Sequence, residues 1–288
     1  MTLPELDSLK ALAVSLLRAG NPAPDAYCES YTVTQVSACS GETRSTSLAR
    51  IRPDGSVARF QYRSWNEGAD PAMGEFRGSL SARRWTELMR RIAAMEWKEE
   101  PGMPSPSVPP SPTQPIQVLK LSDGKRTASF SVAGPAPVSI GAAMGAPDVL
   151  ADSAADTVWS LSLSETRLKP VKKGIRFTAT WRHRGAVPVS IVWPDSGGRH
   201  GCGKAILEWA GEDEASEARF ESALKHKGKA RSWKPGKNGS DRMEILFPYT
   251  RPEPGKKTGK LREFGVLVTP AGGAGPVPLT FFSDRIAF

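Results

Sequence analysis

Two stretches decide the fold of the C-terminal part of the chain: residues 175–181, Ile-Arg-Phe-Thr-Ala-Thr-Trp, and residues 188–193, Pro-Val-Ser-Ile-Val-Trp. In both, apolar and polar residues alternate, which is the pattern of a half-buried strand. Gly, Pro, Asp and Lys separate such runs at intervals of roughly 10–30 residues, and six or seven short strands in about 120 residues predict an all-β sandwich. Further runs of this kind lie at residues 205–209, 243–247, 264–268 and 279–288.

The N-terminal part is predicted to be an α+β region, with antiparallel strands and helices on one face of the sheet. Leucines at three- and four-residue spacing predict an amphipathic first helix that ends at Gly20, and Ser81 is the expected N-cap of the second helix. Asp-Gly pairs at 54–55 and 123–124 predict tight turns between strands. The expected strands cover 27–36, 46–52, 56–62, 116–121 and 127–132, and the expected helices cover 1–20, 81–92 and 147–161.

Residues 101–116, Pro-Gly-Met-Pro-Ser-Pro-Ser-Val-Pro-Pro-Ser-Pro-Thr-Gln-Pro-Ile, form a proline-rich insert in this region. Seven of its sixteen residues are proline, which has no N–H for a helix or a ladder, so a stiff polyproline-II connector is expected. Each flanking half runs strand, Asp-Gly turn, strand, helix, which suggests an internal repeat without residue identity. Near residue 166 the sequence pattern changes to a series of short strand-like runs, and the predicted domains are therefore 1–165 and 166–288.

The formal charge of +9 is spread unevenly. Residues 166–288 contain 23 Lys and Arg against 12 Asp and Glu, a net +11, whereas residues 1–165 carry a net −2. A basic domain speeds encounter with acidic proteins, nucleic acids or anionic lipids, but net charge does not choose among them.

The three cysteines are Cys28, Cys39 and Cys202, too few for a disulfide framework. Free thiols in a reducing cytosol are the favoured interpretation, and a Cys28–Cys39 disulfide in an exported protein is the alternative. The apolar part of the N-terminus is short, and Glu5 and Asp7 stand where a signal peptide would carry positive charge. No apolar run approaches ~18 residues. We therefore expect a cytoplasmic protein without a membrane span, with export as the alternative.

No set of residues predicts catalysis, a metal or a cofactor. His200 and Cys202, with Asp195 nearby, are the closest approach to a metal cluster, but zinc needs three or four converging ligands. Gly201-Cys-Gly-Lys204 lacks the spacing of a phosphate-binding loop. Alternation places His183 at the exposed end of a strand, and its arginine neighbours make it a poor general base. We therefore expect a protein that is not an enzyme.

Residues 225–237, Lys-His-Lys-Gly-Lys-Ala-Arg-Ser-Trp-Lys-Pro-Gly-Lys, are the strongest candidate for a partner contact. Three interpretations stay open: a solvated loop between strands, a contact for an acidic protein, or a contact for nucleic acid through phosphates and one stacked base. The candidate partner-binding residues are Lys225, Lys227, Lys229, Arg231, Trp233, Lys234 and Lys237.

Three motifs carry a family resemblance: Gly-Ser-Leu-Ser-Ala-Arg-Arg-Trp-Thr-Glu-Leu at 78–88, Leu-Lys-Leu-Ser-Asp-Gly-Lys at 119–125, and Ala136-Pro137. In this order, residues 27–162 resemble the emfourin-type inhibitors of thermolysin-like metalloproteases. That family's Ser-Gly-Gly stands here as Ala-Cys-Ser-Gly at 38–41, so no functional residue is carried over.

The runs at 176–181 and 184–189 resemble paired strands of bacterial immunoglobulin-like domains, without a Cys-Trp-Cys core. Together these features predict a non-catalytic bacterial protein-binding protein, an inhibitor or immunity protein that neutralises an acidic toxin or a protease. The alternative is an accessory protein that binds nucleic acid or an anionic surface through its basic C-terminal domain.

Overall fold

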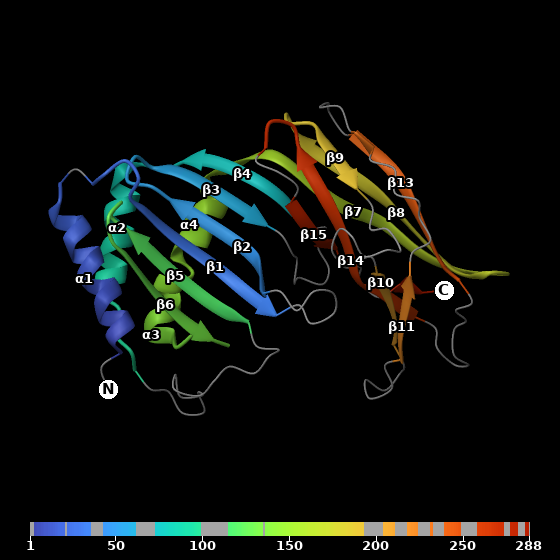
Figure 1. Ribbon diagram of the computed structural model, residues 1–288, viewed down its shortest axis with the longest axis horizontal. Coiled ribbons are helices and arrows are strands. Elements are labelled where there is room, and N and C mark those ends of the chain that lie inside the picture. Colours follow the sequence, from blue (N-terminus) through green and yellow to red (C-terminus); the bar gives the residue numbers. More distant parts are fainter. Residues whose placement is uncertain are drawn as a thin grey trace. The chain divides into compact units, whose positions relative to one another are not determined.

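The computed structural model shows a chain built mostly from antiparallel strands, with a few helices (Figure 1). It divides into two compact units, each described by itself. Unit 1 is formed from Met1–Val36, Glu42–Phe60 and Glu75–Asp156, and unit 2 mainly from Thr157–Phe288. No helix among the described residues is long and apolar enough to cross a membrane. The structure describes residues 3–20, 22–35, 43–61, 73–98, 115–134, 136–192, 204–210, 218–223, 231–232, 239–248, 258–273, 277–281 and 286–287.

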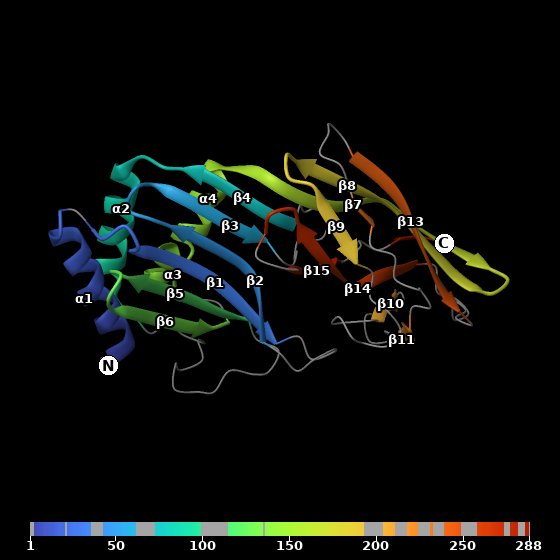
Figure 2. The same ribbon diagram turned by 45° about the horizontal axis from the view of Figure 1, so that its top comes forward.

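Unit 1 contains a sheet in the order β4-β3-β2-β1-β5-β6 and four helices (Figures 1 and 2). The predicted mixture of antiparallel strands and helices is therefore present. The elements are α1 (Pro4–Arg18), β1 (Tyr27–Gln35), β2 (Thr43–Ile51), β3 (Ser56–Gln61), β4 (Met73–Ser79), α2 (Ala82–Ala93), β5 (Ile116–Ser122), β6 (Thr127–Ala133), α3 (Val138–Met144) and α4 (Ala146–Ala154).

One hydrophobic core joins the helices of unit 1 to one face of its sheet. The leucine stripe of α1 is buried, and Pro4 at the first turn and Arg18 at the last suit a helix start and end. On β1 the core face carries Cys28, while Tyr27 and Tyr31 alternate to the opposite face and are half-buried. The sheet therefore has one face under the helices and a second face with aromatic side chains.

The predicted helix over residues 147–161 is wrong in its second half. The helix α4 ends at Ala154, and β7 (Ala155–Val171) begins at the next residue. Beyond this point the buried side chains follow a period of two, at Trp159, Leu161 and Leu163. Alternation and β-branched residues favour a strand, and here they outweigh the spacing of Val149, Leu150, Val158 and Leu161 that suggested a helix.

Unit 2 contains a three-stranded group, β7-β8-β13, and a second sheet in the order β11-β10-β14-β9-β12, with β15 and β16 also paired to β14. The predicted strands at 175–181, 205–209, 243–247 and 264–268 are present. Within the predicted strands at 188–193 and 279–288, the structure describes strands over 189–192, 279–281 and 286–287. The strands β7, β11 and β12 were not predicted. The bounds are β8 (Gly174–Gly185), β9 (Val189–Val192), β10 (Lys204–Ala210), β11 (Ala218–Ala223), β12 (Arg231–Ser232), β13 (Gly239–Pro248), β14 (Thr258–Pro270), β15 (Val277–Phe281) and β16 (Ile286–Ala287).

Side chains from both sheets of unit 2 form one core. Trp181 on β8 and Phe281 on β15 meet edge to face, with ring centroids 4.7 Å apart and planes at 88°. Edge-to-face aromatic pairs of this kind stabilise a core beyond the area they bury. The core therefore fixes which face of β8 points inward, and its arginines alternate to the other face.

A bulge interrupts the pairing of β7 with β8 between Ser164 and Arg167. Glu165, at this bulge, has φ 53°, a left-handed conformation that is uncommon for a residue with a side chain. The extra residue changes the alternation, so that Leu168 is buried and Arg167 is exposed.

Candidate functional site

Most of the predicted partner-binding residues lie outside the described residues. These are Lys225, Lys227, Lys229, Trp233, Lys234 and Lys237. Arg231 is the exception: it lies in β12 and pairs with Ile191 of β9. His200, Cys202 and Cys39 also lie outside the described residues, and Lys204 begins β10.

The prediction that His183 is exposed is wrong. Its side chain is fully buried, and its Nε2 lies 3.0 Å from the Val187 carbonyl oxygen. On β8 it shares the inward face with Trp181, while Arg182 and Arg184 point outward. Burial lowers the pKa of His183, so the neutral ring is favoured in the folded protein. The arginines on both sides of His183 in the sequence do not indicate its exposure, because alternation along a strand places neighbouring residues on opposite faces.

The outward face of β7, β8 and β13 carries a cluster of cations that the sequence analysis did not recognise as a set. All six are exposed. We call this cluster the basic face, and its members are Arg167, Lys169, Arg176, Arg182, Arg184 and Arg242.

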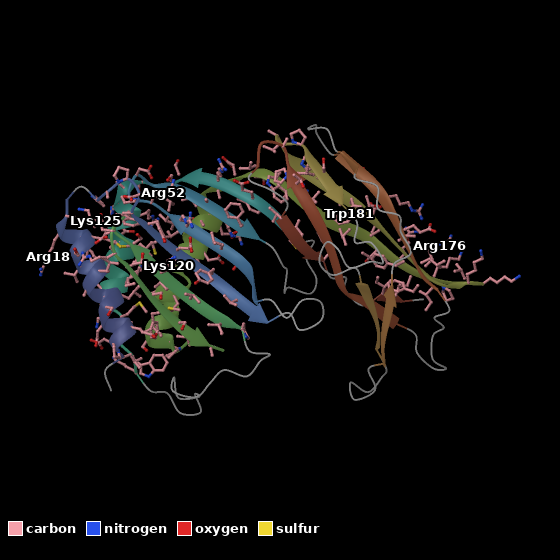
Figure 3. All side chains as sticks on the ribbon, viewed as in Figure 1. Arg18, Arg52, Lys120, Lys125, Arg176 and Trp181 are labelled. Atoms are coloured by element: carbon pink, nitrogen blue, oxygen red, sulfur yellow. The ribbon has the colours of Figure 1, made fainter. Side chains whose placement is uncertain are left out.

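Strand register shows that the members of the basic face share one side of the sheet. Lys169 stands opposite Arg176, and Arg167 stands opposite Thr178. On the other flank of β8, Arg242 stands opposite Thr180. Directly opposed residues of an antiparallel pair point to the same side, so the rows continue across three strands. Arg176 and Trp181, both labelled in Figure 3, belong to opposite faces of β8.

Two carboxylates neutralise part of this charge. Glu165 accepts hydrogen bonds from the Thr180 hydroxyl at 2.8 Å and from Arg182 Nη2 at 3.2 Å. These hydrogen bonds, with that of Thr180 the stronger cause, lower the pKa of Glu165. Glu244 pairs with Arg176 at 3.0 Å.

Four members of the basic face form no ion pair with any other residue that the structure describes; they are Arg167, Lys169, Arg184 and Arg242. Lys172 and Lys173 form the exposed turn between β7 and β8 and add two more cations at one end of the same strands. Four cations without an ion pair to another described residue, followed by two lysines at the hairpin, leave a strong local excess of positive charge on this face.

Hydroxyl groups fill most of the remaining outward positions. Ser162 and Ser240 flank Arg182 on the two neighbouring strands, and Thr180 lies next along β8. Among the described residues of this face none is aromatic, and Leu246, with 37% of its surface exposed, is its large apolar residue. Guanidinium and hydroxyl groups together can donate hydrogen bonds to the oxygens of phosphates, sulfates or carboxylates.

A second cluster lies on the face of the unit 1 sheet opposite the helices. We call it the Tyr27 cluster; it consists of Tyr27, Glu29, Arg50 and Lys120. Arg50 lies over the Tyr27 ring at 4.9 Å from its centroid, and the Lys120 ammonium lies 5.7 Å away. Arg50 Nε donates to the Glu29 carboxylate at 2.7 Å, and the Glu29 side chain is only 7% exposed.

The charges of the Tyr27 cluster are arranged so that one cation is in excess. Arg50 compensates the buried carboxylate of Glu29, and an interaction with the Tyr27 side chain raises the pKa of Lys120. Lys120, labelled in Figure 3, therefore stays charged beside an aromatic ring. Tyrosine and arginine, two of the residue types of this cluster, are enriched in protein–protein interfaces.

Among the described residues no group of three or more His, Cys, Asp or Glu side chains could hold a metal ion. Cys28 is a free and fully buried thiol, and burial together with the charge of Glu29 raises its pKa, so the reactive thiolate is disfavoured. The described clusters can hold an anionic or a protein partner by charge and hydrogen bonds.

Comparisons with protein-family models, with curated proteins and with solved structures find no match to this chain.

Proposed function

We propose that the protein is a non-catalytic binding protein that holds an anionic macromolecule on the basic face of unit 2. The observation that supports this most strongly is the excess of six exposed cations over two carboxylates on one side of β7, β8 and β13. A sheet holds its side chains in fixed rows, so the cations are placed for binding without the ordering of a flexible tail.

A salt-elution experiment tests this proposal. Heparin on a column serves as a polyanion probe, and elution of the wild type is compared with that of the double variant Arg184→Glu/Arg242→Glu. The matched control is Arg52→Glu/Lys125→Glu, which changes the net charge equally at two exposed turns of unit 1 (Figure 3). We expect the basic-face variant to elute at clearly lower salt than the control, because interaction energy depends on where the charges lie. Equal shifts in the two variants would refute the placement.

The Tyr27 cluster supports a second candidate function: binding of a protein partner as an inhibitor or immunity protein. An aromatic ring between two cations offers the anchor that protein interfaces favour, and the excess charge of Lys120 suits an acidic partner. The resemblance of residues 27–162 to emfourin-type inhibitors agrees with this role.

Capture experiments separate this second candidate from the first. The wild type, Tyr31→Ala and the conservative control Tyr31→Phe are immobilised and exposed to host extract in high salt, which suppresses polyanion binding. Tyr31 is half-buried on the same sheet face as Tyr27. A protein that Tyr31→Ala fails to retain and Tyr31→Phe retains would support an interface here. A retained protein unaffected by both variants would place the contact elsewhere.

We also propose that unit 2 is an immunoglobulin-like sandwich. The single core shared by its two sheets and the edge-to-face pair of Trp181 and Phe281 support this arrangement. Such domains present loops and sheet faces as binding surfaces on a rigid framework.

A further inference from the structure

We propose that the basic face binds the sugar–phosphate backbone of double-stranded nucleic acid without reading its sequence. This inference rests on the proposed function and names the class of its anionic partner. It is argued from the dimensions of the face, the chemistry of its side chains and the residue types that it lacks.

The dimensions of the face match a stretch of duplex. Arg176 and Arg184 are eight residues apart on β8, and at about 3.3 Å per residue they span roughly 27 Å. A duplex places a phosphate about every 3.4 Å of axis on each strand, so roughly eight phosphates per strand fall within this length. Arg167 on β7 and Arg242 on β13 are separated by one strand, which puts their rows about 10 Å apart. This separation lies between the widths of the minor and major grooves, about 6 and 12 Å, so the two rows can face the two backbones that border a groove.

The side chains suit phosphate oxygens. Five of the six cations on the face are arginines, whose planar guanidinium can donate two hydrogen bonds to one phosphate. Ser162 and Ser240 place hydroxyl donors on both sides of Arg182. Arginine, lysine, serine and threonine are the side chains that most often contact the phosphates of DNA, and such contacts position a protein without specifying bases.

The residue types missing from the described face argue against other partners. A single strand is held by stacking its bases on aromatic side chains, and the described part of this face has none. A protein interface is centred on aromatic or apolar anchors, and the described part of this face offers few of them, the exposed Leu246 and the half-buried Val171. A membrane-surface site usually combines basic residues with apolar side chains that enter the lipid, and the same shortage applies.

The number of contacts predicts a steep salt dependence. The four unpaired cations of the face and the two lysines of the β7–β8 turn could neutralise about four to six phosphates, which gives a slope of log K against log salt of about −4 to −5. Replacing Arg184 and Arg242 by glutamine removes two contacts and should reduce the slope by about 1.8. If the wild type and the variant bind equally at 1 M salt, this difference in slope makes the affinity of the variant about 30-fold lower at 0.15 M salt.

Fluorescence anisotropy with the full chain tests this inference. The probes are two 20-bp DNA duplexes of unrelated sequence, a 20-nucleotide single strand, poly-glutamate, and vesicles that contain anionic phospholipid. We expect both duplexes to bind with similar affinity and more tightly than the other probes. Arg184→Gln/Arg242→Gln should weaken duplex binding about 30-fold, and the control Arg52→Gln/Lys125→Gln less than about threefold. Unchanged melting temperatures establish that the variants are folded.

Each other outcome overturns part of the account. If the single strand, poly-glutamate or the vesicles bind as tightly as the duplexes, and the basic-face variant weakens that binding, the proposed function stands and the assignment to duplex is wrong. If the basic-face variant binds every probe as the wild type does, or no probe binds, both proposals are wrong.

Discussion

Removing a negative charge from the basic face should strengthen its binding to a polyanion. Glu165 holds Arg182 by a 3.2 Å hydrogen bond and accepts the Thr180 hydroxyl at 2.8 Å. In Glu165→Gln the amide oxygen can still accept from Thr180, but the residue no longer neutralises Arg182. One additional cation then becomes available, which steepens the slope of log K against log salt by about 0.9 and raises affinity at 0.15 M about fivefold.

The control for this gain is another carboxylate held by arginines, the half-buried Glu87. Glu87 accepts from Arg83 Nε at 2.9 Å and from Arg84 Nη1 at 3.1 Å, on α2 of unit 1. Glu87→Gln changes the net charge equally, away from the basic face. Duplex titrations by anisotropy at 0.1–0.4 M salt measure both slopes. The reasoning is refuted if Glu165→Gln binds no better than the wild type, or if Glu87→Gln gains as much.

Further predictions concern the framework that carries the basic face. Burial lowers the pKa of His183 below its ordinary value of 6.5, so the unfolded chain binds more protons than the folded protein below that pH. The free energy of unfolding should therefore fall as the pH decreases from about 6.5 towards 5. His183→Asn should flatten this part of a denaturation–pH profile. Gly185 has φ 110°, and a Cβ added there would lie 2.2 Å from a backbone oxygen, so Gly185→Ala should lower the free energy of unfolding by more than about 3 kcal/mol. In the control Gly272→Ala, at φ 75° in open space, the loss should be only about 1 kcal/mol. Urea titration measures both. Phe281→Ala should lower the free energy of unfolding by about 3–5 kcal/mol, because it leaves a cavity beside Trp181. A loss below about 1 kcal/mol would contradict a core shared by the two sheets.

Local patterns predicted many elements because their signals lie within a few residues. The leucine spacing of α1 and the stripe of Trp85, Leu88, Met89 and Ile92 in α2 place apolar side chains on one helix face, and these residues are buried as expected. The Asp-Gly turn at 123–124 is where β5 and β6 join. Such features depend on backbone preferences and periodicity that a single segment contains.

The features that were not predicted depend on the tertiary arrangement of the chain. Residues 155–161 were predicted to be the end of a helix, but the buried positions of this segment follow a period of two. His183 was predicted to lie at the exposed end of a strand, whereas alternation along the full length of 175–185 puts it on the same face as Phe177 and Trp181. Reading the same alternation for the even positions would have found Arg176, Arg182 and Arg184 together.

The part of the basic face contributed by β7 and β13 could not be predicted from any single segment. Arg167 and Arg242 are far apart in sequence, and strand pairing brings both beside β8. The bulge at Glu165 also shifts alternation by one residue, so a simple period of two would have placed Arg167 on the wrong face.

Arginine footprinting tests the central claim most directly. The free protein and its complex with a 20-bp duplex are treated with phenylglyoxal, which modifies accessible guanidinium groups, and modified sites are identified by mass spectrometry. The account predicts that Arg182, Arg184 and Arg242 are protected in the complex, while Arg52 and Arg91, exposed on unit 1, react as in the free protein. Protection of Arg52 or Arg91 with continued reaction of the basic face would contradict it.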